Sequence, residues 1–340
     1  MSDKKKMGFF QKTKNMTDTN LLLAITMIVF FAMYIGAMIF EGKGFLKAQT
    51  FLNMLNANAA LIIASCGMSI VMITGSIDIS VGGVAALVSM CCAVYLDYHG
   101  GNVVTAIFIS LGIGLLFGLV QGYLVAYLDI QPFIVSLAGM FFARGMTTIV
   151  NTEPFNVQNE AFVKLKETRV IVPGLGSVNK LGKYVNAYVE IGVVVALILV
   201  IVLFCMLRWS KSGRNFYAVG GNQQSALMLG INVKKTKFMA HLLCSLLAGI
   251  GGFVYFMHVG SGSASHATGM EMNAIASSII GGTMLTGGVG NIIGTLFGVL
   301  SLSTIQNIVS SAGLDQAWWT GITIAAMLCL FLVIQSVVMS

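Results

Sequence analysis

The sequence predicts an all-α polytopic membrane protein with about ten transmembrane helices, and three observations lead to that prediction. Only 9% of the 340 residues are charged and 57% are hydrophobic, so the chain lacks the polar surface that a soluble domain needs. Apolar runs of about 20 residues recur along the chain, and a helix of that length crosses a hydrocarbon core roughly 30 Å thick. A helix also bonds its own backbone groups, which lipid cannot do.

The apolar runs are expected to form the spans in order along the chain. The first run is long for a signal peptide and no small-residue cleavage site follows it, so it is interpreted as a retained span of an unprocessed chain. The eighth run is short and rich in Gly and Ser, which is typical of a broken or re-entrant helix. The expected spans are 21–40, 52–73, 80–97, 103–127, 133–150, 188–208, 238–257, 270–285, 289–311 and 318–338.

Lysine and arginine predict which side of the membrane each connecting segment faces. Residues 1–20 carry five lysines, and residues 208–237 carry six basic residues and no acidic one. Cytoplasmic segments are enriched in basic residues, so both segments are expected in the cytoplasm. Ten spans place the N- and C-termini there as well. The predicted organisation is a cytoplasmic tail at 1–20 and one transmembrane domain at 21–340, with a cytoplasmic loop at 209–237 and an external loop at 151–187.

The external segment 151–187 has mixed charge and contains two of the three prolines in the chain. It is expected to be an irregular loop with a short helix around 158–168. Two interpretations of this segment remain open. Either it covers the outer face of the protein, or it docks an external partner.

Composition argues against several other classes of protein. The six cysteines lie inside apolar runs without metal-type spacing to histidine, so they are interpreted as buried small hydrophobes, and no metal or cofactor is expected. The formal charge of +7 comes from residues at span ends, so no nucleic-acid partner is expected. No phosphate-binding loop of the form G-x-x-x-x-G-K-[ST] occurs, and no nucleophile–base set or carboxylate pair is evident. The chain is therefore predicted to be no enzyme.

The most informative polar segment is 213–233. It is expected to begin as a turn, and Asn222 is expected to cap a helix over 223–229 by accepting from its free N–H groups. Gly230 is suited to end that helix in a left-handed conformation. The helix has an apolar side, so it either docks a partner or lies on the membrane surface. The apolar side consists of Ala226, Leu227 and Leu229.

A short internal echo relates residues 75–82 to residues 281–288. In both segments a glycine is followed five residues later by a hydroxyl residue and two residues after that by another glycine. Duplication of a span–turn–span unit is one interpretation, and chance similarity of glycine-rich turns is the other. Asp78 is expected to cap the helix that starts near Ser80, with a proton relay as the alternative. The expected turn residues are Gly75, Asp78, Ser80, Gly82, Gly281, Gly282, Thr286 and Gly288.

These segments resemble the permease subunits of bacterial sugar ABC importers, in particular the ribose and galactose/galactofuranose group. The resemblance covers nearly the whole chain from residue 20, in order and in spacing. Trp318-Trp319 and the segment 137–145 are most similar to galactofuranose-type permeases. The matched residues are Gly75, Ile77, Asp78, Ser80, Val81 and Gly82, with Ile79 in place of Leu; Gly213, Arg214, Tyr217, Ala218, Gly220, Gly221, Asn222, Gly230, Ile231 and Val233; and the run from Ile280 to Gly290.

The resemblance implies a channel-forming permease subunit in the bacterial cytoplasmic (inner) membrane, which translocates a pentose or hexose such as a galactofuranose-like sugar. Its implied partners are a cytoplasmic ABC ATPase, an extracytoplasmic sugar-binding protein and a second permease copy, identical or related. The segment 213–233 would hold the helix that couples the channel to the ATPase. The implied ATPase-coupling residues are Arg214, Tyr217, Gly220, Gly221, Asn222, Ala226, Leu227, Leu229 and Gly230.

Polar side chains at membrane depth are candidates for the substrate pathway. Arg144 directly follows two phenylalanines in the fifth expected span, and buried charges in lipid usually face the bundle interior or serve a function. It either donates to sugar hydroxyls beside the stacking phenyl rings, or it braces helices. An amide cluster at the start of the second span either faces the outer mouth or bonds between helices. The expected pathway residues are Asn58, Phe141, Phe142 and Arg144.

A secondary sugar transporter or facilitator that works without an ATPase is the alternative function. Such a protein would need a site for a coupling ion, typically paired carboxylates or an unwound helix near the midplane. Only Arg144 and His241 lie well inside expected spans, and no acidic pair accompanies them. His241 is interpreted as a packing histidine whose hydrogen bonds are satisfied.

Overall fold

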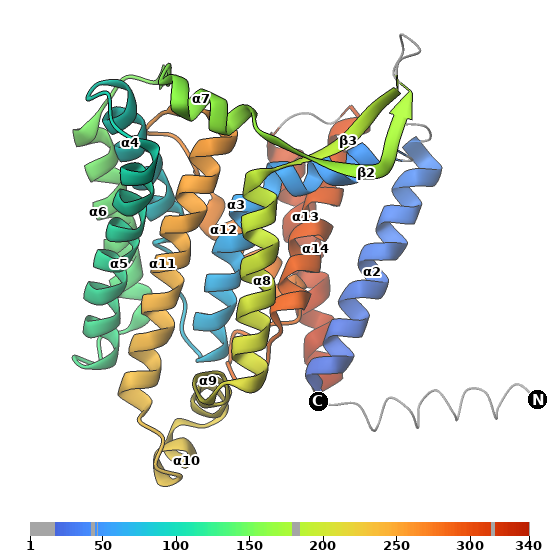
Figure 1. Ribbon diagram of the computed structural model, residues 1–340. Helices are drawn as coiled ribbons and strands as arrows, with labels where there is room; N and C mark the ends of the chain where they lie inside the picture. The colour runs from blue at the N-terminus through green and yellow to red at the C-terminus, as the bar shows by residue number, and fades with distance from the viewer. Residues whose placement is uncertain (1–17, 42–44, 46, 179–183, 314–316, 340) are drawn as a thin grey trace, which may run out of the picture.

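The chain folds into a bundle of helices, several of which are long and apolar enough to cross a membrane (Figure 1). The computed structural model describes residues 18–41, 45, 47–178, 184–313 and 317–339. Eight helices within these residues meet the length and composition of a span, which confirms the prediction of a polytopic membrane protein. They are α2 (Asp18–Glu41), α3 (Ala48–Ile73), α5 (Val103–Ala126), α6 (Pro132–Val150), α8 (Ile191–Trp209), α11 (Val233–Val259), α13 (Ile292–Ser311) and α14 (Ala317–Met339).

Two of the expected spans are shorter helices. The third expected span is α4 (Val81–Asp97), with 17 residues, and the eighth is α12 (Met270–Ile280), with 11 residues. A helix of that second length rises only about 16 Å, roughly half of a hydrocarbon core. It ends where Gly281 leads into Gly282, whose φ of +86° a right-handed helix cannot continue. The expected shortness of this segment is confirmed, whereas the total of ten spans stays a prediction.

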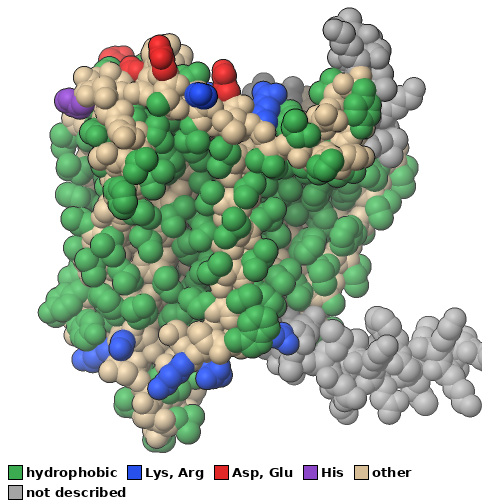
Figure 2. All heavy atoms as spheres, viewed as in Figure 1, with side chains coloured by type: hydrophobic (Ala, Val, Ile, Leu, Met, Phe, Trp, Pro, Cys, Tyr) green, Lys and Arg blue, Asp and Glu red, His purple; other side chains and the backbone are tan. Residues whose placement is uncertain are grey.

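The charged side chains gather at the two ends of the bundle. Hydrophobic side chains cover the sides. At one end Lys and Arg are the charged side chains in view, whereas at the other end Asp and Glu lie together with some Lys and Arg (Figure 2). Helices α9 (Lys211–Gly221) and α10 (Gln223–Met228) lie at the basic end (Figure 1). Helix α2 begins and α14 ends at this same end. The lysines of the N-terminal head, at positions 4 to 14, lie outside the described residues.

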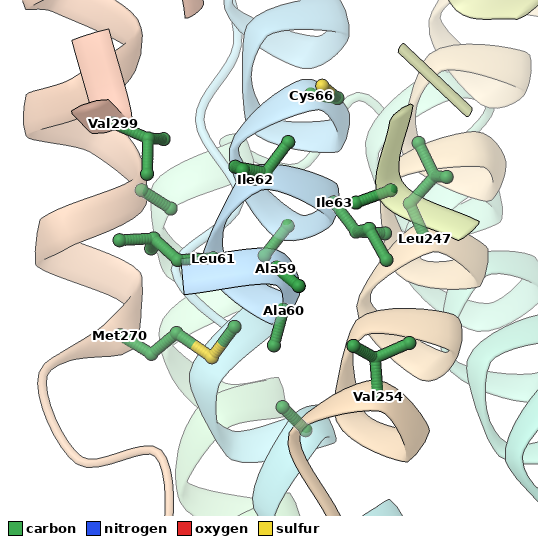
Figure 3. Packing of buried hydrophobic residues seen from close by; sticks show 14 of the residues in the cluster. Ala59, Ala60, Leu61, Ile62, Ile63, Cys66, Leu247, Val254, Met270 and Val299 are labelled. Carbon is green, nitrogen blue, oxygen red and sulfur yellow. The ribbon is translucent and has the colours of Figure 1, made fainter. Parts of the chain in front are cut away.

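Helix α3 forms the centre of the bundle, because almost every residue beyond Asn53 is buried. Its apolar side chains pack against α11 on one side and against α12 and α13 on the other (Figure 3). Helices α5 and α11 pack closely against each other. A Cβ added at Gly118 would lie 2.9 Å from the Cα of Leu242, and Gly114 and Gly122 make similar contacts one turn away. Small residues spaced by four permit such close packing where lipid supplies no hydrophobic driving force.

Hydroxyl groups join α3 to α12 and α13. Ser65 and Ser277 share a hydrogen bond of 2.8 Å, and the Oγ of Ser69 lies 3.0 Å from that of Ser278 and 2.6 Å from the Oγ1 of Thr295. All these side chains are buried. Each hydroxyl has a partner on a neighbouring helix, so the network holds α3, α12 and α13 together without leaving polar groups in the apolar interior.

The segment at the acidic end is more regular than expected. The short helix around 158–168 is confirmed as α7 (Glu160–Glu167), capped by Asn159, whose Oδ1 accepts from the backbone of Phe162 at 3.2 Å. The expectation of an irregular loop is wrong, because β2 (Arg169–Val178) and β3 (Tyr184–Glu190) form an antiparallel hairpin. Their β-branched valines and isoleucine favour extended backbone. Two further two-residue strands, β1 (Phe155–Asn156) and β4 (Ser261–Gly262), pair with each other.

Candidate functional site

Helices α9 and α10 form a helix–break–helix unit at the basic end. The expectation of a turn at the start of this segment is wrong, because α9 begins at Lys211 and Ser210 caps it by accepting from the N–H of Gly213 at 3.0 Å. The predicted cap at Asn222 is confirmed. Its backbone is extended, and its Oδ1 accepts from the N–H of Ser225 at 2.8 Å. Gly230 has a φ of +76°, the left-handed conformation that was predicted.

The end of α10 exposes three consecutive apolar side chains, which we call the α10 tip. Leu227, Met228 and Leu229 are 65%, 87% and 79% exposed, whereas Ala226 is buried. Ala226 therefore anchors α10 rather than contributing to its exposed face. Met228 was missed by the sequence analysis, although its place between two leucines was a usable signal. The tip borders an open hollow of about 670 Å³, whose lining includes Asp129, Lys234 and Lys237.

Backbone contacts between glycines join the three sequence motifs, and we call this place the glycine junction (Gly75, Gly220, Gly221, Gly287 and Gly288). A Cβ at Gly220 would overlap the carbonyl oxygen of Ile73, and a Cβ at Gly287 would lie 2.8 Å from the nitrogen of Gly75. The N–H of Gly288 donates to the carbonyl of Ile73 at 2.9 Å. Side chains at Gly220 or Gly287 would separate the end of α3 from α9 and from the turn before α13.

Tyr217 and Arg214 hold α9 in place beside the glycine junction. The hydroxyl of Tyr217 donates to the carbonyl of Gly290 at 2.8 Å. Burial raises the pKa of Tyr217 to about 12, so the phenol keeps the proton that it donates. Arg214 is exposed and donates to the carbonyl of Trp209 at 3.1 Å, where the backbone carbonyls at the end of α8 need partners. Neither side chain touches the α10 tip.

The two echo segments lie against each other. The carbonyl oxygen of Thr286 is 3.5 Å from where a Cβ of Gly75 would be. In the first segment the Oδ1 of Asp78 accepts from the backbone N–H of Ser80 at 3.0 Å and from its hydroxyl at 2.6 Å, which is the expected contact at the start of α4. In the second, Gly281 packs on the backbone of Gly294. Gene duplication stays a prediction.

Arg144 bonds backbone groups instead of facing an open space. Its guanidinium donates to the carbonyls of His266 at 2.5 Å and Ala267 at 2.8 Å, and it lies 3.9 Å from the carboxylate of Glu271. That carboxylate sits against Gly82, where a Cβ would overlap it. Burial lowers the pKa of His266, so a neutral imidazole adds no charge next to Arg144. These contacts fit the alternative in which Arg144 braces helices.

The structure does not bring the expected pathway residues together. Phe141 and Phe142 are 64% and 59% exposed on the outer side of α6, away from the contacts of Arg144. Asn58 lies on α3, where its amide donates to the carbonyl of Met54 at 2.8 Å and to the Oγ of Ser303 on α13 at 2.9 Å. Of the four expected residues, Asn58 lines a hollow.

That hollow, which we call the amide vestibule, lies between the start of α3 and the end of α13 and measures about 670 Å³. None of the described residues that line it is charged. Gln306 and Asn307 were missed by the sequence analysis, although two adjacent amides inside an apolar run are a usable signal. The polar lining residues are Thr50, Asn53, Asn58, Ser303, Gln306, Asn307 and Ser311.

Comparison with known proteins shows the family to which the chain belongs. The family model described as "branched-chain amino acid transport system / permease component" matches residues 50–332. The inner membrane ABC transporter permease protein YjfF of Escherichia coli K12 is 35% identical over 320 residues, which cover 94% of this chain and 93% of that protein. The chain belongs to the family of sugar ABC importer permeases.

Two further members of the sugar permease family carry a sugar in their names. The fructose import permease FruG of Bifidobacterium longum is 34% identical over 284 residues, covering 83% of this chain and 81% of FruG. The ribose import permease RbsC of E. coli K12 is 32% identical over 273 residues, covering 80% of this chain and 81% of RbsC. No solved structure matches the chain. A sugar ABC permease is a multi-pass protein of the bacterial cytoplasmic membrane and a transport subunit rather than an enzyme.

Proposed function

We propose that the chain forms half of the translocation channel of an ABC importer for a monosaccharide, a pentose or a hexose with galactofuranose-like sugars among the candidates. The observation that carries this proposal is the uncharged lining of the amide vestibule. An amino acid would bring an ammonium and a carboxylate, which need charged partners away from water. A sugar brings neutral hydroxyls, and amide groups can both donate to them and accept from them. The vestibule therefore favours a sugar over a branched-chain amino acid.

The distribution of charge supports one orientation in the membrane. The basic end, with α9 and α10, would face the cytoplasm, and the acidic end, with α7 and the β2–β3 hairpin, would face the outside. In this orientation the tail at 1–20 and the loop at 209–237 are cytoplasmic, and the segment 151–187 is external. The amide vestibule then opens outwards, where a sugar-binding protein would release its ligand.

The α10 tip would dock on a cytoplasmic ABC ATPase. Three exposed apolar side chains on a helix with a cap at one end and a left-handed glycine at the other suit a protein groove. The glycine junction ties α9, which precedes α10, to the end of α3 by backbone contacts. A displacement of α10 would therefore move the end of α3 instead of being absorbed by a flexible loop.

A second permease copy would complete the channel. Asn53 and Ala57 are exposed on α3 where the amide vestibule opens, and the amide of Asn53, whose Oδ1 accepts from Gln49 at 2.7 Å, is polar surface that lipid solvates poorly. A neighbouring copy that covers this surface removes that cost and encloses the vestibule. Two identical copies are the simplest arrangement, and a related permease in place of one copy is the alternative.

The test of ATPase docking is co-purification of the chain with its ATPase after replacing Leu227 and Leu229 together with Asp. We expect the ATPase to be lost, because two carboxylates cannot enter an apolar groove without partners. The matched control replaces Val170 and Ile171, two exposed apolar side chains of β2 at the opposite end of the bundle, with Asp, which adds the same charge away from α10. ATPase binding that survives in the leucine variant would contradict the docking role of the α10 tip.

The test of the importer as a whole uses proteoliposomes. We expect sugar to accumulate only when the ATPase, the binding protein and ATP are all present. Accumulation against a gradient by this chain alone would instead support the alternative, a secondary transporter that works without an ATPase.

A further inference from the structure

A second polar cluster lies inside the bundle, apart from the glycine junction and the amide vestibule. Asp78 belongs to the turn before α4, Gln121 to α5, and His241 and Ser245 to α11. All four side chains are buried. The amide of Gln121 donates to the Oγ of Ser80 at 2.8 Å, and that hydroxyl in turn donates to the Oδ1 of Asp78 at 2.6 Å. Three separate segments of the chain therefore meet at these residues.

Helix geometry brings His241 into the same cluster. Ser245 lies one turn further along α11, and its hydroxyl donates to the Oδ2 of Asp78 at 3.4 Å. Residues four apart share one face of a helix, so the imidazole points to the same side of α11 as this hydroxyl. Gly118 and Gly122 of α5 lie against the backbone of Leu242 and Phe238, which places Gln121 alongside this stretch of α11. The hydrogen bond of Ser245 thus places the carboxylate of Asp78 on the side of α11 to which His241 points.

Three buried polar atoms of this cluster have no protein partner within the described residues. They are both ring nitrogens of His241 and the Oε1 of Gln121. The interpretation of His241 as a packing histidine with satisfied hydrogen bonds is therefore wrong. Buried polar groups in folded proteins are bonded either by protein or by ordered water. A water molecule has two donors and two acceptors, so one water can accept from the imidazole and donate to Gln121 and Asp78.

We propose that Asp78, Gln121, His241 and Ser245 form a buried site that binds water and one exchangeable proton, with the imidazole of His241 as the proton acceptor and Asp78 as its counter-charge. Histidine is the side chain whose protonation changes near neutral pH. The charged groups that act on His241 are Asp78, from the turn, and Lys237, one turn earlier on α11. Gln121 of α5 and Ser245 face it as neutral groups.

The position of the site gives the proton a structural consequence. Asp78 lies three residues after Gly75 of the glycine junction, and α11 starts directly after the segment that holds α10. A proton on His241 adds attraction between this turn and α11, and its loss removes that attraction. The charge of His241 would therefore affect the contact between the end of α3 and α11, the helix that follows α10.

The test is a histidine titration by nuclear magnetic resonance of the permease alone, labelled with ¹⁵N-histidine in lipid nanodiscs. The chain contains four histidines, so His241→Gln assigns the signal. We expect the ring signals of His241 to titrate reversibly between about pH 4 and pH 8, where histidines change charge. In Asp78→Asn the midpoint should fall by about one pH unit or more, a tenfold weaker proton binding, because the opposite charge is lost. A ring that does not titrate, or a midpoint unmoved by Asp78→Asn, would overturn the proposal.

A matched control exists in the same chain. His258 pairs with Glu190 at 2.7 Å on the surface, so Glu190→Gln removes a negative charge outside the cluster and should leave the titration of His241 unchanged. A shift of His241 in that variant would mean that its midpoint reports the overall charge of the protein, and the proposal would fail.

Hydration is tested separately, because Asp78 also holds the start of α4 and its variant can fail to fold. Magnetisation transfer from water to the His241 ring should be present in the wild type. Gln121→Met keeps the carboxylate and removes one acceptor, so it should lower the transfer at least about twofold if the water uses three partners. If no magnetisation is transferred to the His241 ring in the wild type, or if the transfer is equal in both proteins, the proposed water-binding site is wrong. Neither measurement involves sugar or ATPase, so failure here leaves the proposed function untouched.

Discussion

Two hollows of the same volume, about 670 Å³ each, lie at opposite ends of the bundle, and their linings differ. The hollow beside α10 is lined by apolar side chains, by the charged Asp129, Lys234 and Lys237, and by the amides of Gln223, Gln224 and Asn232. The described lining of the amide vestibule is uncharged, with Asn58, Gln306 and other polar side chains. Apolar groups framed by charges are typical of a surface that binds a protein, because the charges stay hydrated at the rim. Neutral amides inside a membrane protein suit an uncharged solute.

The volume of a hollow therefore does not by itself indicate its function in this protein. The two ends are connected through α3, which begins at the amide vestibule and ends at the glycine junction. We therefore expect substitutions at the close contacts of the junction, such as Gly220, to affect both ends, and substitutions in either hollow to affect one.

The first prediction concerns the link between the two ends. In Gly220→Ala the new methyl group would overlap the carbonyl oxygen of Ile73, and a backbone atom cannot move aside as a flexible side chain can. We expect sugar uptake to fall more than about tenfold and the protein to lose roughly 1–3 kcal/mol of stability, the usual cost of overpacking. Uptake and thermal unfolding in detergent measure the two effects.

Gly221→Ala is the matched control for that prediction. A Cβ at this neighbouring position meets no atom within 4 Å. The variant should transport sugar as the wild type does. If both alanines behave alike, close contact at Gly220 is not what connects the ends.

The second prediction concerns the amide vestibule. Asn307→Leu keeps a similar volume and removes the amide, so we expect sugar uptake to fall roughly three- to tenfold, as for one lost hydrogen bond of about 0.5–1.5 kcal/mol. ATPase binding should not change, because the vestibule and the α10 tip lie at opposite ends. Ser310→Ala, on an exposed residue of the same helix turn, is the control. An Asn307→Leu protein with normal uptake would remove the vestibule from the pathway.

The third prediction compares two helix caps of the same residue type. Asn222→Ala removes the cap of α10 and should weaken ATPase binding by about 1 kcal/mol, or roughly fivefold, because the tip is less well ordered before docking. Asn159→Ala removes the cap of α7 at the other end, along with bonds to the carbonyls of Leu96 and Gly101. It should lower the unfolding temperature more than Asn222→Ala and leave ATPase binding unchanged. Equal effects on binding would show that α10 has no special role.

The fourth prediction concerns Tyr217. Tyr217→Phe loses the bond to the carbonyl of Gly290, so stability should fall by about 0.5–1.5 kcal/mol. Burial raises the pKa of the folded phenol to about 12 from its ordinary value of about 10, so its contribution to stability is complete below pH 10 and is lost as the pH rises towards 12. Thermal unfolding of both proteins from pH 8 to 12 measures this. If the unfolding temperatures of the two proteins change with pH in parallel, the phenol of Tyr217 does not contribute to the pH dependence of stability.

Local features of the chain were predictable from the sequence. The apolar runs, the cap at Asn222, the left-handed Gly230 and the short helix α7 all depend on residues within a few positions of one another. The hairpin β2–β3 and helix α9 were missed because they depend on residues further away along the chain. Their polar and glycine-containing sequences resemble loops, and pairing or packing with distant residues makes them regular.

The interior polar groups were less predictable. Arg144 was weighed as a sugar ligand or a brace, and its partners His266 and Ala267 lie more than a hundred positions further along the chain. His241 was expected to be satisfied, yet its ring nitrogens have no partner within the described residues. A side chain at membrane depth needs a partner, but the sequence does not say which of several polar groups will supply it.

The many membrane crossings and the capped apolar helix in a basic loop followed from the sequence, because composition, periodicity and capping residues act over short distances along the chain. The relation to sugar permeases came from the resemblance of three motifs to that family. Only the tertiary structure determined that Gly75, Gly220 and Gly287 touch, and that the amides of α3 and α13 share one hollow. Such contacts join segments far apart in sequence, and they form only where the packing of several helices leaves room for backbone against backbone.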